Sequence, residues 1–210
     1  MFPFFKKAKV GKDASVVHTT AVRNELQELV ALYPAEPLPT LASTSRFPLV
    51  TTLEPFELAA YHMSLMPRAS SLAELRNVIE HEDFQHEVGQ SARFLSLRNP
   101  AGKTVSLCEQ TEFNNVSLIV ITNSMQLVAA LRQIDIAPPT PWEVFPEVDP
   151  ESLGSLQGDM AYWWNTYWTP FWNSLEKAEQ IAFLDRFECP AEWREFIDFH
   201  DGMNNQEVSP

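Results

Sequence analysis

The sequence predicts an α+β fold: a small, mostly antiparallel sheet with flanking helices, followed by an acidic, aromatic-rich helical C-terminal part. Three observations support this prediction. Apolar residues recur with helical spacing before about residue 80 and after residue 150, but with strand-like spacing between residues 94 and 122. Five prolines fall between residues 138 and 150, and five of the six tryptophans fall between residues 163 and 193.

The first two helices are predicted for residues 21–32 and 54–66. The first helix ends before a proline-rich stretch, whereas Pro55 occupies the first turn of the second helix and Pro67 stops it. One face of the first helix is apolar. That face consists of Val22, Leu26, Leu29 and Val30.

A third helix is predicted to begin at Ser71, because Ser71 and Glu74 match a capping box. Its apolar residues recur every three or four positions and form a buried stripe. The stripe consists of Leu72, Leu75, Val78 and Ile79.

A hairpin is predicted next, because residues 94–97 and 104–108 flank the turn sequence Asn99-Pro100-Ala101-Gly102-Lys103. Residues 116–122 are rich in Val and Ile and form a buried strand. Either Asn123 or Ser124 then caps a helix that extends to about residue 133.

The C-terminal part is predicted to be helical, because its aromatic residues lie within about 120° of one another at helical spacing. This stripe consists of Met160, Trp164, Trp168, Phe171, Trp172 and Leu175. Pro170 interrupts the stripe, either as a kink or at the first position of a new helix.

Two more helices follow in the prediction. Ser174 caps the first of them, and Pro190 opens the second, which Gly202 ends. The residues expected inside are Ala178, Ile181, Ala182 and Leu184 in the first helix and Trp193, Phe196 and Ile197 in the second.

These elements divide the chain into an α+β domain (residues 1–136), a proline-rich linker or extended strap (137–150) and the acidic helical part (151–210). The helical part either stands apart or packs on the first domain as one unit. Residues 1–15 are predicted to form a flexible arm. The alternative is a weak membrane contact, because three phenylalanines precede four lysines there.

Negative charge is concentrated in the C-terminal part. The chain has a formal net charge of -13, and residues 143–210 contain fourteen acids against Lys177, Arg186 and Arg194. Nucleic-acid binding requires clustered cations, so this charge argues against it and favours a basic protein as partner.

The chain is predicted to be cytoplasmic. It has no secretory h-region and no apolar run of membrane-spanning length. Cys108 and Cys189 alone cannot build a disulfide framework or a four-thiolate metal site. The six glycines include no phosphate-binding loop, and the serines include no nucleophile elbow, so neither a cofactor nor a catalytic residue is predicted.

The tryptophan stripe has three interpretations: a core, a protein-binding surface or a ligand pocket. If exposed, Trp163, Trp164, Trp168 and Trp172 would anchor a partner. The acidic residues of this part have two interpretations: a solvated helix face, or a surface that steers a basic partner toward the chain. The candidates for steering are Asp159, Glu176, Glu179 and Asp185.

The segment from His81 to Glu87 is the only candidate for a metal site, and a weak one. Two histidines flank a glutamate, but His81 and His86 are five residues apart, which places them about 140° apart on a helix. They could meet a metal only if the segment unwinds. The alternative is a polar helix end.

Residues 189–202, Cys-Pro-Ala-Glu-Trp-Arg-Glu-Phe-Ile-Asp-Phe-His-Asp-Gly, resemble the proline-aromatic-helix-glycine segment of SUKH-type immunity proteins. In that superfamily a sheet follows this segment, whereas here only eight residues follow, so the resemblance does not extend to the fold. A helix with proline at its first position and glycine after its end has the same pattern.

The sequence therefore predicts a non-enzymatic binding protein that occludes a basic protein partner, most concretely an immunity or antitoxin-like inhibitor of a bacterial toxin. This last step is an analogy with small acidic intracellular proteins. One alternative is a metal-dependent enzyme that uses His81 and His86. The other is a structural subunit in which the tryptophans form a homo-oligomer contact.

Overall fold

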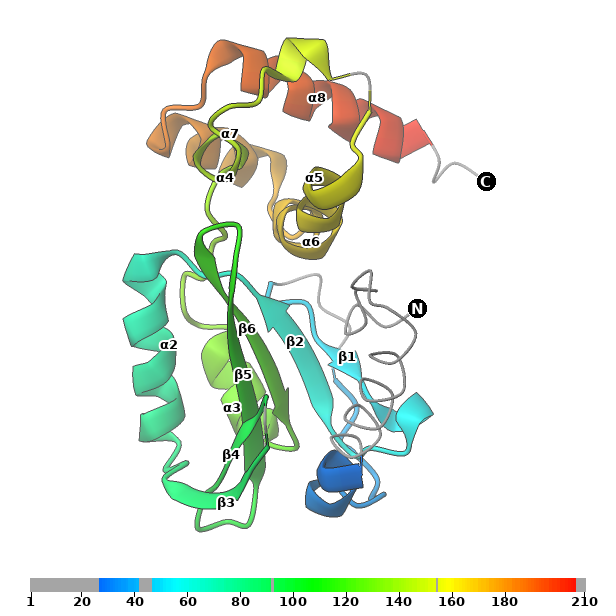
Figure 1. The fold of residues 1–210 in the computed structure, drawn as a ribbon, viewed down its shortest axis with the longest axis vertical. Coiled ribbons are helices and arrows are strands. Elements are labelled where there is room, and N and C mark those ends of the chain that lie inside the picture. Colours follow the sequence, from blue (N-terminus) through cyan, green and yellow to red (C-terminus); the bar gives the residue numbers. More distant parts are fainter. Residues whose placement is uncertain (1–26, 42–46, 92, 154, 207–210) are drawn as a thin grey trace, which may run out of the picture.

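The computed structural model describes residues 27–41, 47–91, 93–153 and 155–206. Its centre is a six-stranded antiparallel sheet in the order β1-β2-β6-β5-β4-β3, with helices on its faces and a helical part at one end (Figure 1). The α+β prediction is confirmed. The strands are β1 (Thr51–Thr52), β2 (Tyr61–Leu65), β3 (His86–Gln90), β4 (Leu95–Arg98), β5 (Thr104–Glu112) and β6 (Asn115–Thr122).

Two helices cover one face of the sheet: α2 (Ala69–His81) and α3 (Met125–Leu131). On this face alternate residues of the strands point inward, such as Tyr61, Met63 and Leu65 of β2, because strand side chains have a period of two. They pack against Leu75 and Ile79 of α2 and form the first core.

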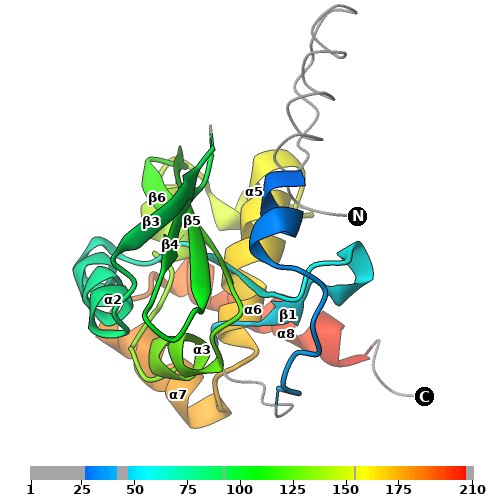
Figure 2. The ribbon, with the colours of Figure 1, turned by 90° about the horizontal axis from the view of Figure 1, so that it is seen from below.

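A short helix over residues 27–32 covers the opposite face, as the view from below shows (Figure 2). Leu29 and Tyr33 pack there against Cys108 and Ile121. The buried Tyr33 hydroxyl donates to the Ile121 carbonyl at 2.9 Å and contacts the Ser106 hydroxyl at 2.9 Å. The N-terminal arm and residues 21–26 of the predicted first helix lie outside the described residues.

The predicted hairpin is confirmed, because Arg98 of β4 pairs with Thr104 of β5. In the connecting turn, Gly102 donates from its backbone N–H to the Asn99 carbonyl and has φ of 75°, which favours glycine. The strand at 116–122 and its helix are confirmed as well. Ser124 is the N-cap of α3, and its hydroxyl accepts from the Leu127 N–H at 3.1 Å.

The prediction of a helix over residues 54–66 is wrong. A single 3-10 turn, η1 (Glu54–Phe56), carries Pro55 in its first turn, and strand β2 then occupies Tyr61–Leu65. Tyr61, Met63 and Leu65 are buried, whereas His62 and Ser64 between them are partly exposed. Over so few residues, strand and helix periodicities both fit the sequence, and pairing with β6 decides for the strand.

Helix α2 is confirmed, but its predicted capping box is wrong. The N-cap is Arg68, without a side-chain cap bond, and the Ser71 hydroxyl instead donates to the Asp135 carbonyl at 3.1 Å. Ser71 therefore connects α2 to the chain after α3. Leu75 and Ile79 of the predicted stripe are buried, and Leu72 and Val78 are partly buried.

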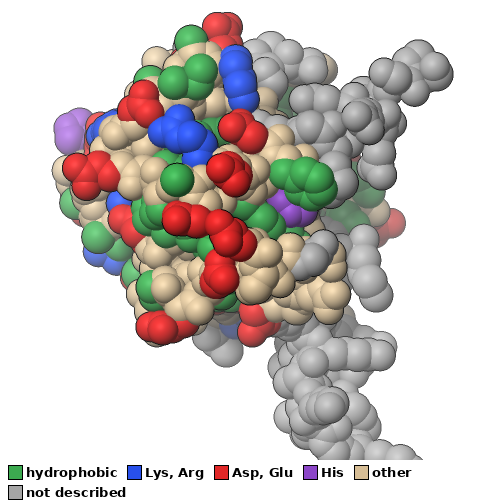
Figure 3. Space-filling view, turned by 90° about the horizontal axis from the view of Figure 1, so that it is seen from above, with side chains coloured by type: hydrophobic (Ala, Val, Ile, Leu, Met, Phe, Trp, Pro, Cys, Tyr) green, Lys and Arg blue, Asp and Glu red, His purple; other side chains and the backbone are tan. Residues whose placement is uncertain are grey.

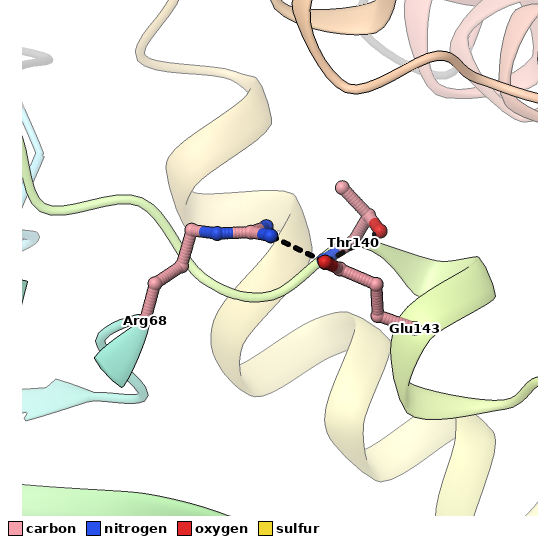
Figure 4. Close-up of polar contacts among 3 residues, drawn as sticks. All are labelled: Arg68, Thr140 and Glu143. Atoms are coloured by element: carbon pink, nitrogen blue, oxygen red, sulfur yellow. Dashed lines mark hydrogen bonds and ion pairs between the residues drawn. The ribbon is translucent and has the colours of Figure 1, made fainter. Parts of the chain in front are cut away.

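Residues 137–150 leave the sheet and enter the helical part. Residues 137–141 are buried. The short helix α4 (Pro141–Val144) begins in a capping box. In this box the Glu143 carboxylate accepts hydrogen bonds from the Thr140 backbone N–H at 2.7 Å and from the Thr140 hydroxyl at 2.8 Å. Arg68 forms an ion pair with the same carboxylate (Figure 4). The guanidinium of Arg68 also lies 4.2 Å from the centroid of the Phe187 ring. Arg68 therefore connects the end of the sheet to two segments of the helical part.

The helical part lies against one end of the sheet, around the tip of the β5–β6 hairpin (Figure 1). Phe113 at that tip contacts the rings of Phe145 and Tyr162. The Tyr167 hydroxyl donates to the Glu112 carboxylate at 2.7 Å. The helices after α4 are η2 (Pro150–Ser152), α5 (Gly158–Trp163), η3 (Trp164–Trp168), α6 (Thr169–Trp172), α7 (Lys177–Arg186) and α8 (Ala191–Gln206).

Three details of the predicted C-terminal helices are wrong. The N-cap of α7 is Glu176, in a capping box with Glu179, whereas the Ser174 hydroxyl donates to the Phe171 carbonyl at 2.6 Å. Helix α8 continues past Gly202. Most of the predicted interior of α7 is exposed, because Phe183 and Leu184 set its buried face. The exposed residues are Ala178, Ile181 and Ala182.

Within the described residues, no helix combines the length and the apolar character needed to cross a membrane.

Candidate functional site

The four tryptophans expected to anchor a partner lie in the interior. Trp163 is 0% exposed, and the other three are at most 4% exposed. They pack with Trp193, Phe196 and Ile197 of α8, which were correctly expected inside, in one aromatic core. Of the three interpretations of the stripe, the structure shows the core. An exposed ring is the condition for direct contact with a partner, and none of the four tryptophans meets it.

A π-helical turn organises this core. Helix η3 spans Trp164–Trp168, and the Thr169 N–H bonds to the Trp164 carbonyl, five residues back. Pro170 follows at the start of α6, so the chain continues through it as a helix. Trp163, Trp168 and Trp172 consequently form a column of stacked rings, with neighbouring centroids 6.1 and 5.1 Å apart.

The four predicted steering acids are exposed, but they do not form one group. Asp159 lies in the first turn of α5, whereas Glu176, Glu179 and Asp185 lie on α7 or at its N-cap. Glu176 and Glu179 complete the capping box of α7. Asp185 forms an ion pair with Arg194 at 2.7 Å. Three of the four therefore stabilise the helical part itself.

The cations of the helical part are all engaged in ion pairs. Lys177 pairs with Asp198 at 3.5 Å, Arg186 with Asp135 at 3.2 Å, and Arg194 with Asp185. The pairs of Lys177 and Arg194 join α7 to α8 in opposite order along the two helices, so these helices are antiparallel. Seen from above, acidic side chains spread across this end of the molecule among few basic ones (Figure 3).

On α7, α8 and the loop between them, three described acids that the sequence analysis did not single out form no ion pair with the described residues: Glu188, Glu192 and Glu195. All three are exposed, Glu188 directly after α7 and the other two on α8. Glu192 and Glu195 are one turn apart and so lie on neighbouring positions of the α8 surface. Their pattern in the sequence, three acids in eight residues, was the available signal.

Helix α7 also carries an exposed apolar residue. Ile181 is 48% exposed, although the sequence placed it inside. It is four residues from Lys177 and four from Asp185, so helical spacing places it on the same side of α7, between the two ion pairs to α8. We call the surface that these two helices and their connection expose the α7–α8 face: it carries the exposed Ile181, flanked along α7 by the two ion pairs, and the three acids without ion pairs.

The predicted metal candidates are exposed and lie on different elements. His81 ends α2, where its Nδ1 atom lies 2.8 Å from the Asn77 carbonyl oxygen, and His86 begins β3. Among the residues that the structure describes, no three His, Cys, Asp or Glu side chains are grouped as metal ligands would be.

Cys108 and Cys189 form no disulfide. Cys108 is buried in the sheet. Burial raises the pKa of the Cys189 thiol to about 11. Cys189 is therefore protonated at neutral pH, whereas a nucleophilic cysteine acts as the thiolate.

Comparisons of the chain with protein-family models, with curated proteins and with solved structures found no match. Together, the fold and the surface define an α+β protein with a six-stranded antiparallel sheet and an acidic α7–α8 face.

Proposed function

We propose that this chain is a cytoplasmic, non-enzymatic binding protein that occludes a basic protein partner with its α7–α8 face. The observation that carries the proposal is the charge balance of this face. Its lysine and arginines already pair with acids of the same chain, while Glu188, Glu192 and Glu195 stay exposed. Charge that is not balanced internally attracts a partner of opposite sign.

The rigidity of the face supports the same proposal. Helices α7 and α8 both pack on the aromatic core, and two ion pairs hold them side by side. A preorganised surface loses little conformational entropy on binding, so more of its interaction energy appears as affinity. In this proposal the tryptophans act indirectly: they hold the acids in place. Ile181 supplies the apolar contact with the partner.

The most concrete form of the proposal is an immunity-type inhibitor of a bacterial toxin. Its support is the acidic composition and the resemblance of residues 189–202 to a segment of SUKH-type immunity proteins. In this form the mechanism is occlusion: the partner's basic functional surface is covered, and no reaction takes place.

The test is an affinity pull-down of the tagged chain from its native cell at low salt, with elution by rising salt. The test variant carries Glu188→Gln, Glu192→Gln and Glu195→Gln. Its matched control carries Glu74→Gln, Glu80→Gln and Glu87→Gln, which removes the same charge from exposed positions on α2 and β3. We expect one basic protein to elute with salt, to bind the control as it binds the wild type, and to bind the test variant more weakly and with a smaller salt dependence.

A second variant tests the four acids that the sequence analysis singled out: Asp159→Asn, Glu176→Gln, Glu179→Gln and Asp185→Asn. Glutamine and asparagine retain the hydrogen-bond acceptors of the helix caps, so the helices stay intact. If neither variant changes the affinity or its salt dependence, the acidic face is not the binding site. If only copies of the chain itself are recovered, the face is a homo-oligomer contact.

A further inference from the structure

A cavity of about 410 Å³ lies where the two parts of the molecule meet. One wall is the β1–β2 edge of the sheet, with Thr51, His62 and Ser64, and the other is the helix η3, with Asn165 and Thr166. The exposed ring of Phe56 lines the cavity as well. The volume falls within the range typical of small-molecule sites, roughly 300–1,000 Å³, and such sites often lie between domains.

Among the described residues, the lining combines apolar side chains with hydroxyl, amide and imidazole groups and carries no carboxylate and no cationic side chain. In a chain with a net charge of -13, a cavity whose described lining residues include no charged side chain is distinctive. Thr51, Ser64, Asn165 and Thr166 offer hydroxyl and amide groups, each of which can both donate and accept a hydrogen bond. A charged ligand would find no counter-charge among these groups, and burying an unpaired charge is costly.

His62 fits the same chemistry. Burial lowers its pKa to about 4, so the imidazole is neutral at pH 7 and adds no charge to this wall. Its Nδ1 atom lies 3.4 Å from the Thr51 hydroxyl. The wall that these two residues form therefore presents polar groups without charge.

The opposite wall is a π-helical turn. Asn165 and Thr166 lie in η3, and both line the cavity. Single π turns within α-helices are rare and occur frequently at functional sites. Apolar surface accompanies the polar groups, because Leu49 and Phe56 also line the cavity and are 54% and 44% exposed.

We propose that this cavity binds an uncharged carbohydrate unit of one or two rings. A sugar ring has hydroxyls around its edge, which match the hydroxyl and amide groups, and C–H faces, which match the Phe56 ring. The proposal is independent of the α7–α8 face and its partner, because none of the residues that line the cavity belongs to α7 or α8.

The test is ligand-observed NMR and calorimetry on the full chain with glucose, galactose, N-acetylglucosamine and maltose, and with glucuronic acid and glucosamine as charged counterparts. We expect at least one neutral sugar to bind with a measurable dissociation constant, and the charged counterparts to bind more weakly. Thr166→Val and Asn165→Ala should each raise that constant about five-fold or more, since each removes a hydrogen bond.

The matched control is Thr111→Val, which removes an exposed hydroxyl from the end of β5, outside the cavity. It should leave sugar binding unchanged. Thermal unfolding of every variant, followed by circular dichroism, shows that the fold is retained. The proposal is wrong if no neutral sugar binds in a saturable manner, if charged and neutral sugars bind equally, or if Thr166→Val and Asn165→Ala bind as the wild type does. Saturable binding of an uncharged peptide without any sugar binding would assign the cavity to a peptide and overturn the proposal too.

Discussion

Trp163 and Trp168 stack with their ring centroids 6.1 Å apart and their planes 22° apart, although five residues separate them in the chain. On an ideal α-helix, two residues five positions apart point about 140° away from each other. The π-helical turn of η3 removes this offset, because its hydrogen bond closes at the fifth residue. The turn therefore adds Trp163 to the aromatic column and so completes the core of the helical part.

The indole N–H groups of Trp163 and Trp168 differ in their hydrogen bonding, so replacing each tryptophan with phenylalanine should lower the free energy of unfolding by different amounts. The Trp163 Nε1 atom donates to the Met66 sulfur at 3.3 Å, whereas the buried Trp168 Nε1 atom has no acceptor among the described residues. An unsatisfied buried donor costs about 1–3 kcal/mol, and Trp168→Phe removes it. Urea unfolding should show that Trp163→Phe lowers the free energy of unfolding by about 1 kcal/mol more than Trp168→Phe.

Both substitutions remove a similar apolar area, so each serves as the control for the other. An unchanged m-value would show that both variants unfold as the wild type does. A larger loss for Trp168→Phe would mean that its indole N–H finds a partner.

Arg68 is predicted to be irreplaceable by lysine. Its guanidinium pairs with the Glu143 carboxylate and lies over the Phe187 ring, and lysine has neither the planar stack nor the forked donors. We expect Arg68→Lys to lower the free energy of unfolding by on the order of 1 kcal/mol. Arg76→Lys is the matched control, because Arg76 pairs with Glu109 on the exposed surface. Equal losses in the two variants would contradict the connecting role of Arg68.

Acid should weaken the Arg68–Glu143 contact. Burial alone would raise the pKa of Glu143, but the hydrogen bonds from Arg68 and Thr140 lower it below its usual value. A carboxyl with a lowered pKa stabilises the fold above its unfolded-state pKa, and this contribution is lost as pH falls through the folded-state value. The decrease in the free energy of unfolding caused by Arg68→Lys should therefore be smaller in strongly acidic solution than at neutral pH. Measuring the free energy of unfolding of both proteins as a function of pH tests this. A loss that stays constant down to the acid transition would argue against the ion pair.

His62 should make the free energy of unfolding depend on pH in a range above the one in which Glu143 titrates. Its pKa is about 4 in the folded chain against an ordinary value of 6.5, so between these values the unfolded chain binds the proton more readily. The stabilisation of the fold by the neutral His62 is therefore complete above pH 6.5 and is lost as pH falls toward 4. Between pH 7 and pH 5 the wild type should lose about 2 kcal/mol more than His62→Gln, which cannot titrate there. Parallel curves for the two proteins would show that His62 stays accessible to protons.

Glu179 separates helix stability from surface charge. Its carboxylate accepts from the Glu176 N–H at 2.8 Å in the capping box of α7. Glu179→Ala removes this bond and should lower the free energy of unfolding by about 0.5–1 kcal/mol, whereas Glu179→Gln retains an acceptor and should cost less. Thermal unfolding of the two variants checks this. Equal losses would show that the charge, not the hydrogen bond, stabilises α7.

Elements with a strong local signal could be predicted from the sequence. The turn from Asn99 to Lys103 specifies its hairpin through a glycine with positive φ and the hydrogen bond between the Lys103 N–H and the Asn99 side chain. Ser124 specifies the start of α3 through its hydroxyl. In both cases the bonds that form the element join residues only a few positions apart, so the sequence itself contains them.

Elements that depend on distant partners could not be predicted. Strand β2 exists because Tyr61–Leu65 pair with β6 residues more than fifty positions later. Ser71 looks like a helix cap, but it instead bonds to Asp135. The candidate site shows the same limit. The sequence identified the acidic composition of the C-terminal part, but not that Asp185 pairs with Arg194 while Glu192 and Glu195 stay unpaired on the described surface.

The sequence by itself determined the α+β class, the concentration of negative charge after residue 143 and the position of the aromatic stripe. Only the tertiary structure decided that four of the tryptophans of the stripe region lie inside, that Ile181 lies outside, and that β1, β2 and η3 enclose a cavity whose described lining carries no charged side chain. The physical reason is that periodicity shows which residues share a face of a helix or strand. What covers that face depends on segments far away in the chain, and their packing is a property of the whole fold.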